Sequence, residues 1–330
     1  MKGLAKLAPG PGNVGIADRE ERTPGAGEVL IEVHGAGVCG TDLHIEAGEF
    51  TSRPPVTMGH EVSGIVAAVG AGVPASWIGS AVVSETYYAT CGACEWCRTG
   101  RINLCPDRRS IGSIVDGAFA RQVIVPAKNL HRIPPGVDEH AAVLIEPLAC
   151  VCQCLCDPSK VTVGDRVLVT GPGPVGLLAA QVARAQGGNV LVVGLPRDED
   201  RLAAARSLDF ETAFTAAQAA QVVIECSGSE GGATACLEAA DRGARYVQVG
   251  VFGKDVCLPF DHVFRKELTV TSGFASTPRS WRRAIALIES GRVKLQPLVS
   301  EVVSLSEWKR VFGDLRRGKG IKIVFDPRLE

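Results

Sequence analysis

The sequence lacks long apolar runs and lacks an excess of charge of either sign. Its first residues are too polar for a signal peptide, and no later window approaches the length of a membrane span. The 35 Lys and Arg residues nearly balance 36 Asp and Glu residues, which leaves a net charge of −1. This balance argues against a strongly basic nucleic-acid surface and against an acidic tail. The absences predict a soluble, cytoplasmic protein without nucleic-acid or membrane partners.

What the chain does have is length, apolar content and cysteine. With 330 residues and about 150 residues per domain, two domains are expected, and a hydrophobic content of 46% supports sizeable cores. Twelve cysteines in a small secreted chain would indicate disulfides. In a chain of this length without a signal peptide, they indicate metal ligands and buried thiols instead.

The expected secondary-structure pattern changes near residue 141. Before it, short β-rich segments end in the loop Pro134-Pro135-Gly136. After it, a helical run to about Cys156 precedes alternating strands and helices, which is typical of an α/β fold with a doubly wound parallel sheet. The expected strands are 29–33, 64–70, 120–125, 131–133, 167–170, 189–193, 222–226, 246–251, 268–271 and 321–325. The expected later helices are 174–186, 201–208, 233–240, 284–288 and 307–315.

A glycine-rich turn follows the strand expected at 167–170. It reads Gly171-Pro172-Gly173-Pro174-Val175-Gly176, matches GxGxxG and opens a helix. Glycines there permit a tight turn, the close approach of a pyrophosphate and close helix–strand packing, and the helix N-terminus attracts phosphates. The alternative is a glycine-rich turn that binds nothing. The residues expected to contact a nicotinamide dinucleotide are Gly171, Gly173, Pro174, Val175 and Gly176.

The end of the next strand bears on the choice between NAD and NADP. NAD enzymes usually carry an Asp or Glu there for the ribose 2′-hydroxyl, but this chain has Gly194. Arg197, three residues later, would neutralise a 2′-phosphate, which favours NADP. NAD stays open because the acidic residues at 198–200 follow at once, and Arg197 has the alternative of a solvated loop side chain.

Four closely spaced cysteines predict a structural zinc site. Their pattern is C-x2-C-x2-C-x7-C, formed by Cys91, Cys94, Cys97 and Cys105. Four protein ligands close a tetrahedral zinc shell and leave no position for chemistry. An iron–sulfur cluster uses similar ligands, but this spacing favours zinc.

The other cysteines are expected to be small buried residues. Cys150, Cys152, Cys154 and Cys156 alternate along a predicted helix, so neighbours in this series lie on opposite sides and cannot chelate one ion together.

Three short motifs combine Cys, His and Glu. They are Cys39-Gly40-Thr41-Asp42-Leu43-His44, Gly59-His60-Glu61 and Glu146-Pro147-Leu148. Cys39 and His60, with a carboxylate from Glu61 or Glu146, predict a zinc site with an open position. Zinc there would favour the alkoxide of a bound alcohol, which gives up hydride to a nicotinamide. Thr41 and His44 would carry the proton outward, and Asp42 either orients a ligand histidine or only shapes a turn.

Taken together and in this order, the motifs resemble the zinc-dependent medium-chain dehydrogenase/reductase family of the alcohol dehydrogenase superfamily. Glu146, where typical alcohol dehydrogenases have Cys, is similar to the sorbitol and threonine dehydrogenase branch. The resemblance implies a GroES-like β-rich catalytic domain over 1–149, with the structural zinc lobe at about 88–108. It further implies a Rossmann domain over 150–275, a segment 276–330 that returns to the catalytic domain, and a homo-oligomer (dimer or tetramer).

The expected activity is hydride transfer between NAD(P) and a secondary alcohol, namely a polyol, cyclitol or sugar alcohol. An L-threonine 3-dehydrogenase or a general secondary-alcohol dehydrogenase is the alternative that uses the same metal. A non-catalytic NAD(P)-binding sensor or structural protein is the alternative of another class. Loss of a metal ligand or relay residue would favour that last reading, and the chain retains all of them. One departure is that 211–221 is short for the helix that the family has there.

Overall fold

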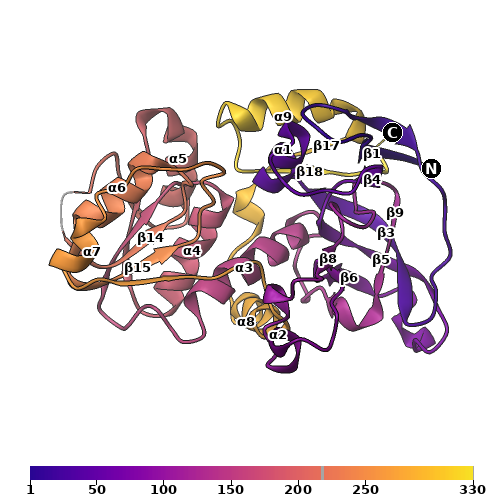
Figure 1. Ribbon diagram of the computed structural model, residues 1–330, viewed down its shortest axis with the longest axis horizontal. Coiled ribbons are helices and arrows are strands. Elements are labelled where there is room, and N and C mark those ends of the chain that lie inside the picture. The colour runs from indigo at the N-terminus through magenta and orange to yellow at the C-terminus, as the bar shows by residue number, and fades with distance from the viewer. Residues whose placement is uncertain (217–218, 330) are drawn as a thin grey trace. The chain divides into compact units, whose positions relative to one another are not determined.

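The computed structural model describes residues 1–216 and 219–329, and the chain forms two compact units (Figure 1). The first unit contains Met1–Glu146 and Val299–Glu330, and the second contains Pro147–Leu298. The return to the first unit therefore starts later than residue 276, where we expected it. The reason is that the residues after 276 pack within the second unit. The Thr277 hydroxyl donates a 2.8 Å hydrogen bond to Gln153 Oε1, and Thr277 is the N-cap residue of helix α8 (Pro278–Glu289).

The first unit is built mainly on antiparallel strand pairs, with one parallel pair at the end of its main sheet. Its main sheet has the order β10-β6-β5-β3-β18-β17, and β9 also pairs with β3. These strands are β10 (Leu130–Arg132), β6 (Ala81–Ser84), β5 (Glu61–Val69), β3 (Glu28–Gly37), β18 (Lys322–Phe325), β17 (Val299–Val303) and β9 (Gln122–Pro126). Smaller sheets join β2 (Val14–Asp18), β1 (Lys2–Lys6) and β4 (Val56–Thr57), and join β7 (Tyr87–Ala89) with β8 (Arg109–Ser110).

Residues from both ends of the chain share the core of the first unit. Alternate β-branched residues of β3, Val29, Ile31 and Val33, are fully buried, as a strand with one face on a core requires. Strand β18 pairs antiparallel with the end of β3, and Phe325 packs edge-to-face on Phe119 with ring centroids 5.1 Å apart. Helix α9 (Trp308–Arg316) adds further apolar side chains to the same core. The N-terminal sheet is thus completed only by the C-terminal segment.

A buried carboxylate secures the end of the chain. Asp326 accepts a 2.9 Å hydrogen bond from His140 Nε2 and a 2.6 Å bond from Arg328 Nη2, which also contacts Glu139. Burial raises the pKa of Asp326, but the hydrogen bonds from Arg328 and His140 outweigh it and lower the pKa to about 2.

We expect Asp326→Asn to lower the free energy of unfolding at neutral pH by about 2 kcal/mol, since each pKa unit corresponds to about 1.4 kcal/mol. A depressed carboxyl pKa stabilises the fold above the unfolded value, and this gain is lost as pH falls through the folded value. The difference between wild type and variant should therefore shrink between about pH 4 and pH 2. Urea unfolding across that range measures it, and a constant difference would contradict the prediction.

The second unit holds the predicted doubly wound sheet. Its strands all run parallel in the order β13-β12-β11-β14-β15-β16. They are β13 (Glu211–Ala213), β12 (Asn189–Val193), β11 (Arg166–Thr170), β14 (Ala220–Glu225), β15 (Ala240–Gln248) and β16 (Thr269–Ser272). The order reverses between β11 and β14, and in such sheets ligands bind beyond the carboxyl ends of the strands at that point.

Helices provide the crossovers that parallel strands require. Helix α4 (Pro174–Ala185) packs on β11 and β12, and α6 (Glu230–Ala239) packs on β14 and β15 (Figure 1). The unit also contains most of α3 (Ile145–Leu155) together with α5 (Glu199–Ser207) and α7 (Asp261–Arg265). Within the described part of the chain, no helix combines the length and apolarity that a membrane crossing needs.

The stretch 211–221, which the sequence shows to be short for a helix, is described in the structure except for two residues. Residues 217 and 218 lie outside the described residues, and the described part of this stretch contains strand but no helix. A cavity of about 680 Å³ lies there against the starts of β11 and β12, lined among others by Arg166, Arg184, Leu191 and Phe210.

Candidate metal centres and cofactor site

Cys39 stands where β3 ends and α1 (Gly40–Ala47) begins. It is the N-cap residue of α1, and its backbone N–H donates a 2.9 Å hydrogen bond to Asp42 Oδ2. Gly37, two residues earlier, is required by close packing, because a Cβ there would lie 2.0 Å from Glu61 Oε2. The turn therefore holds the Cys39 thiol next to the start of β5.

Strand pairing brings the second motif to the same place. Gly37 of β3 is the partner of Glu61 at the start of β5, so His60 and Glu61 lie beside Cys39. Ligand atoms of Cys39, His60 and Glu61 all lie within 4.8 Å of one another. Glu146, in the first turn of α3, is largely buried, and its charge acts on His60. The structure thus brings Cys39, His60 and Glu61 together, and Glu146 lies near them without belonging to this group of ligand atoms.

Asp42 shows that this cluster fits a metal ion. It is completely buried, and its Oδ1, which has no hydrogen-bond partner among the described residues, lies 3.9 Å from His60 Nδ1. Burial raises the pKa of Asp42. A histidine that ligates a metal through one nitrogen commonly donates its other N–H to a carboxylate, and Asp42 is a carboxylate placed near His60 Nδ1. Thiolate, imidazole and carboxylate together are a donor set that zinc accepts.

Lys322 is a residue of this site that the sequence reasoning missed. Its ammonium donates hydrogen bonds of 2.8 and 2.7 Å to the two carboxylate oxygens of Glu61, and one of 2.9 Å to the carbonyl of Val38. Both side chains of this ion pair are buried, at 2% and 0% exposure. Burial opposes the charge on Lys322, but the Glu61 carboxylate outweighs it and raises the pKa of the lysine. No local motif signals a partner 261 residues away in sequence.

We expect Lys322→Met to lower the free energy of unfolding of the zinc-free protein by about 3–5 kcal/mol, because Glu61 would keep a buried charge without a partner. Urea unfolding measures the loss. The additional change Glu61→Gln should restore part of it, since the amide carries no charge. Lys319→Met is the control, because Lys319 is 68% exposed on the same segment. Equal losses at positions 319 and 322 would contradict this account.

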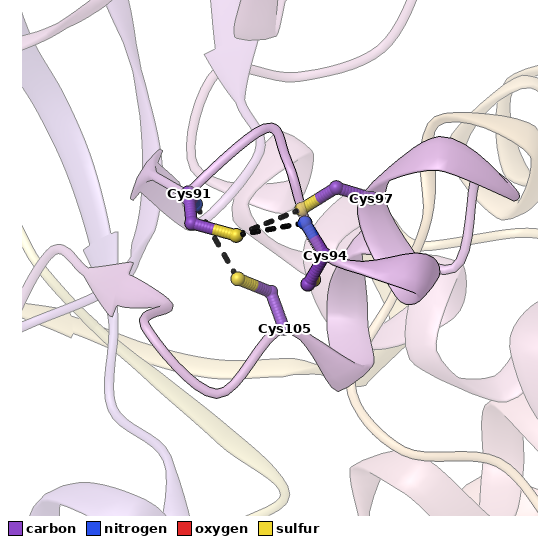
Figure 2. Close-up of side chains that lie close together, drawn as sticks. All are labelled: Cys91, Cys94, Cys97 and Cys105. Atoms are coloured by element: carbon purple, nitrogen blue, oxygen red, sulfur yellow. Dashed lines mark hydrogen bonds between the residues drawn. The ribbon is translucent and has the colours of Figure 1, made fainter.

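The four-cysteine lobe is assembled as the spacing predicted (Figure 2). Ligand atoms of Cys91, Cys94, Cys97 and Cys105 lie within 4.8 Å of one another, and the sulfur atoms of Cys91 and Cys97 are 4.0 Å apart. Backbone N–H groups of the lobe point at the sulfurs, as Cys94 N does toward Cys91 Sγ at 3.3 Å. These hydrogen bonds, with the one from Ala93 N–H, lower the pKa of Cys91 to about 6. Four sulfurs gathered this closely, one of them with a stabilised thiolate, fit a closed zinc shell.

The glycine-rich turn joins β11 to α4 as expected. Gly171 has a φ of +88°, which side chains other than glycine rarely adopt, and a Cβ on Gly176 would lie 1.9 Å from the Gly171 carbonyl oxygen. Gly173 is the N-cap of α4, and Pro174 occupies its first turn. A Cβ on Gly173 would meet no atom within 4 Å. The turn therefore needs two glycines for its own packing and one to leave the helix N-terminus open.

Glu225, at the end of β14, was missed in the sequence. Its buried carboxylate accepts hydrogen bonds from Ser227 N at 2.7 Å and Gln248 Nε2 at 2.8 Å, and a longer one of 3.2 Å from Gly228 N. These bonds hold the loop that follows β14 against the glycine-rich turn, where Ser227 is close enough to Gly171 to exclude a side chain. The carboxyl ends of β11 and β14 thus form one ordered edge.

Comparison with known proteins identifies the family. Residues 25–135 match the alcohol dehydrogenase GroES-like domain, and residues 174–290 match the zinc-binding dehydrogenase domain. The chain is 36% identical to sorbitol dehydrogenase of Halalkalibacterium halodurans, over 99% of both chains. It is 31% identical to L-threonine 3-dehydrogenase of Thermococcus kodakarensis, over 99% of this chain and 98% of that one. The chain belongs to the zinc-dependent medium-chain dehydrogenase family.

Solved structures of such dehydrogenases have the same fold and hold nicotinamide cofactors. A zinc-binding dehydrogenase from Sinorhizobium meliloti bound to NADP superposes with a TM-score of 0.89 at 30% identity, over 99% of both chains. An alcohol dehydrogenase from Escherichia coli CFT073 complexed with NADH superposes with a TM-score of 0.86 at 27% identity, also over 99% of both chains. The expected family, fold class and enzyme class are therefore confirmed.

In this dehydrogenase, the two predicted relay residues lie at different depths. The Thr41 hydroxyl oxygen is 3.8 Å from Cys39 Sγ, directly beside the metal-ligand cluster. His44 lies one helical turn further along α1, and its side chain is 33% exposed. Its Nδ1 is 2.7 Å from Glu49 Oε2, a partner that the sequence reasoning did not identify.

The end of β12 explains why an acidic residue is missing there. A Cβ on Gly194 would lie 2.8 Å from Cγ of Pro172, so the glycine-rich turn already fills the space that a carboxylate side chain would need. Asp198 Oδ2 accepts a 2.9 Å hydrogen bond from Leu195 N and is used in the turn. Arg201, one helical turn after Arg197, is close enough for their charges to interact, and burial lowers its pKa. The sequence reasoning missed this second arginine.

Proposed function

We propose that this dehydrogenase oxidises a secondary alcohol of a polyol, cyclitol or sugar alcohol and transfers the hydride to NAD(P)⁺. The observation that carries the proposal is the cluster of Cys39, His60 and Glu61, backed by the unpaired Asp42 oxygen. The sorbitol dehydrogenase likeness supports a polyol substrate. The glycine-rich turn at the switch point of the parallel sheet supports the cofactor.

In this mechanism, Cys39 and His60 would hold the catalytic zinc with a carboxylate of Glu61 or Glu146. Zinc in such a site is a Lewis acid that eases deprotonation of an alcohol. Asp42 Oδ1 would accept the Nδ1 proton of His60 and keep Nε2 free for the metal. Lys322 donates a hydrogen bond to each carboxylate oxygen of Glu61, and its positive charge reduces repulsion between Glu61 and the other carboxylates. Cys91, Cys94, Cys97 and Cys105 would hold the second, structural zinc.

The proton of the substrate alcohol leaves through side chains of α1. Thr41 Oγ1, beside the cluster, accepts this proton and passes its own toward the surface. His44 Nδ1 is engaged by Glu49, so the histidine exchanges protons with solvent at Nε2. A partly exposed imidazole is suited to that step, because either of its ring nitrogens can carry a proton.

NADP⁺ is the proposed acceptor. Gly194 leaves no carboxylate to repel a 2′-phosphate, and Arg197 and Arg201 supply positive charge at the end of β12. The glycine-rich turn, with Gly171, Gly173, Pro174, Val175 and Gly176, would hold the pyrophosphate at the N-terminus of α4.

We expect Arg197→Ala to raise KM for NADP⁺ about 10- to 100-fold and to leave KM for NAD⁺ unchanged, since a hydrogen bond to a charged group contributes roughly 1.5–3 kcal/mol. Initial rates with each cofactor measure the effect. Arg206→Ala is the matched control, because Arg206 lies on the neighbouring helix α5 and pairs with Glu199. An equal loss with both cofactors would argue against a 2′-phosphate contact.

The proposed function is tested by the absorbance of the reduced nicotinamide. Polyols, cyclitols, simple secondary alcohols and L-threonine are each offered with NAD⁺ and with NADP⁺, with and without a chelator. Chelator-sensitive reduction of NADP⁺ by a polyol is the expected result. Activity with NAD⁺ alone would overturn the cofactor proposal and leave the chemistry intact. Silence with every alcohol, in protein shown to contain zinc, would overturn the substrate proposal.

L-Threonine is the second candidate substrate, because the threonine 3-dehydrogenase of Thermococcus kodakarensis is similar over nearly the whole chain. Its oxidation would use the same metal ligands and relay. The panel separates the two, since a polyol enzyme should be inactive with threonine.

A homo-oligomer is the proposed assembly, and the cytoplasm is the proposed location. Strand β16 is an edge strand of the parallel sheet, and Val270 on this strand is 42% exposed. Phe264 of the preceding α7 is 86% exposed and Phe260 60% exposed, which is unusual for aromatic side chains unless another chain covers them. Light scattering of wild type and of Phe264→Glu tests this, with a monomeric wild type as the overturning result.

A further inference from the structure

Helix α3 has a pair of cysteines at its carboxyl end. Cys152 is fully buried in the last turn, and Cys156 follows the last helical residue, Leu155, and is partly exposed. The backbone N–H of Cys156 donates a 2.9 Å hydrogen bond to the carbonyl of Cys152, so the two residues share one face of the helix. From the sequence we considered cysteines two residues apart, which lie on opposite sides of a helix. Cys152 and Cys156 are four residues apart, so they lie on the same side.

The two thiols interact, and Cys156 has a second donor. The thiols of Cys152 and Cys156 are close enough for each to shift the pKa of the other. Gln186 Nε2 also donates to Cys156 Sγ at 3.5 Å, and it donates to the Leu155 carbonyl at 2.9 Å. The hydrogen bond from Cys152 lowers the pKa of Cys156, with further help from Gln186 and the charge of Arg283, while burial and Asp157 oppose it. Cys156, which is partly exposed and receives the Gln186 amide, is therefore the nucleophile of the pair, and the buried Cys152 is the second thiol.

Other cysteines of the second unit differ in this respect. Burial raises the pKa of Cys154 to about 11, and its thiol donates to the carbonyl of Gly273. Burial likewise raises the pKa of Cys226, and raises that of Cys236 to about 12. Cys257 is exposed. The buried thiols of Cys154, Cys226 and Cys236 are less reactive than Cys156, because the thiolate is the reactive form, and Cys257 lies outside the pair at the end of α3.

We propose that Cys152 and Cys156 form a redox-sensitive dithiol that hydroperoxides oxidise to an intrachain disulfide. The Cys156 thiolate attacks one peroxide oxygen, the O–O bond breaks, and hydroxide leaves as the sulfur becomes a sulfenic acid. Cys152 then attacks that sulfur, the S–O bond breaks, and water leaves as the S–S bond forms. Overall, two thiols lose two electrons and two protons, and hydrogen peroxide is reduced to two waters.

The helix geometry makes this disulfide easy to reverse. Residues four apart on a helix have Cβ atoms about 5–6 Å apart, whereas a disulfide needs about 3.5–4.5 Å. The last turn of α3 must therefore unwind, and the hydrogen bond from Cys156 N to the Cys152 carbonyl must break. Gln186, which caps α4 at the end opposite the glycine-rich turn, would lose its sulfur contact. A bond formed under such strain is readily reduced, as regulatory disulfides are.

Differential alkylation of the zinc-loaded wild-type protein tests the proposal without any variant. After hydrogen peroxide treatment, free thiols are blocked, disulfides are reduced with dithiothreitol, and the new thiols receive a second label. In the tryptic peptide 133–160 we expect Cys150 and Cys154 to carry the first label, and Cys152 and Cys156 to carry the second. The second label on Cys150 or Cys154, or on none of the four, overturns the proposal.

Variants separate the two chemical steps. Cys156→Ser should abolish the second label on Cys152. Cys152→Ser should leave Cys156 as a sulfenic acid that dimedone captures. Cys257→Ser is the matched control, because Cys257 is exposed and lies outside the pair. This variant should leave the label pattern unchanged. A disulfide that persists in Cys156→Ser would overturn the assignment. The readout is the set of fragment masses of the peptide, which locates each label, so it does not depend on the proposed alcohol substrate.

Discussion

Replacement of His60 by alanine is expected to lower kcat/KM for alcohol oxidation roughly a thousandfold. A Lewis-acid metal contributes several kcal/mol of transition-state stabilisation, and each tenfold in rate corresponds to about 1.4 kcal/mol. Without the imidazole, Cys39 and Glu61 would be the neighbouring ligands left in the cluster, and Asp42 would face a void. The measurements are initial rates together with the zinc content of the purified protein, which should fall from two ions per chain toward one.

The matched control for this variant is His131→Ala. His131 is 17% exposed, close to the 14% of His60, and its Nε2 lies 2.9 Å from a carboxylate oxygen of Glu85. It stands outside the metal-ligand cluster. We therefore expect His131→Ala to lose stability but to keep both zinc ions and the rate per folded molecule. If His60→Ala kept two zinc ions and a rate within tenfold of wild type, the catalytic assignment of the cluster would be wrong.

The glycine-rich turn yields the second large effect, through a contrast between two of its glycines. Gly176→Ala places a Cβ 1.9 Å from a backbone oxygen of Gly171, so the turn must open. We expect this variant to melt at a lower temperature and to lose cofactor affinity more than a hundredfold, because a displaced turn no longer aims the helix N-terminus at the pyrophosphate.

Gly173→Ala should separate binding from folding. A Cβ at this position meets no protein atom within 4 Å, and the backbone there is in an ordinary region, with φ −72° and ψ −178°. We expect a melting temperature equal to that of wild type and a weaker affinity for NADP⁺, since the methyl group stands where the pyrophosphate approaches. Thermal unfolding and fluorescence titration with NADPH measure the two quantities. An unchanged affinity in Gly173→Ala would show that the cofactor does not use this turn.

Several elements of this protein could be predicted from short stretches of sequence. Runs such as Val167-Leu168-Val169 and the glycines that follow determine a buried parallel strand and a tight turn through local sterics and burial alone. The spacing of Cys91, Cys94, Cys97 and Cys105 is local too, because a lobe of fifteen residues brings its own sulfurs together. Predictions of this kind succeed since the interacting groups are near one another in the chain.

Tertiary structure decided the contacts that join distant segments. The pairing of β18 with β3 brings Lys322 to Glu61, and the sequence contains no sign of it because an ion pair across 261 residues depends on the whole sheet. The same holds for Gly194, whose lack of a carboxylate follows from the position of Pro172, and for Gln186, which reaches Cys156 from the end of another helix. Sequence by itself determined which chemical groups the chain carries and their local spacing. Only the fold determined which of them meet, because burial, strand register and charge pairing are properties of the assembled core.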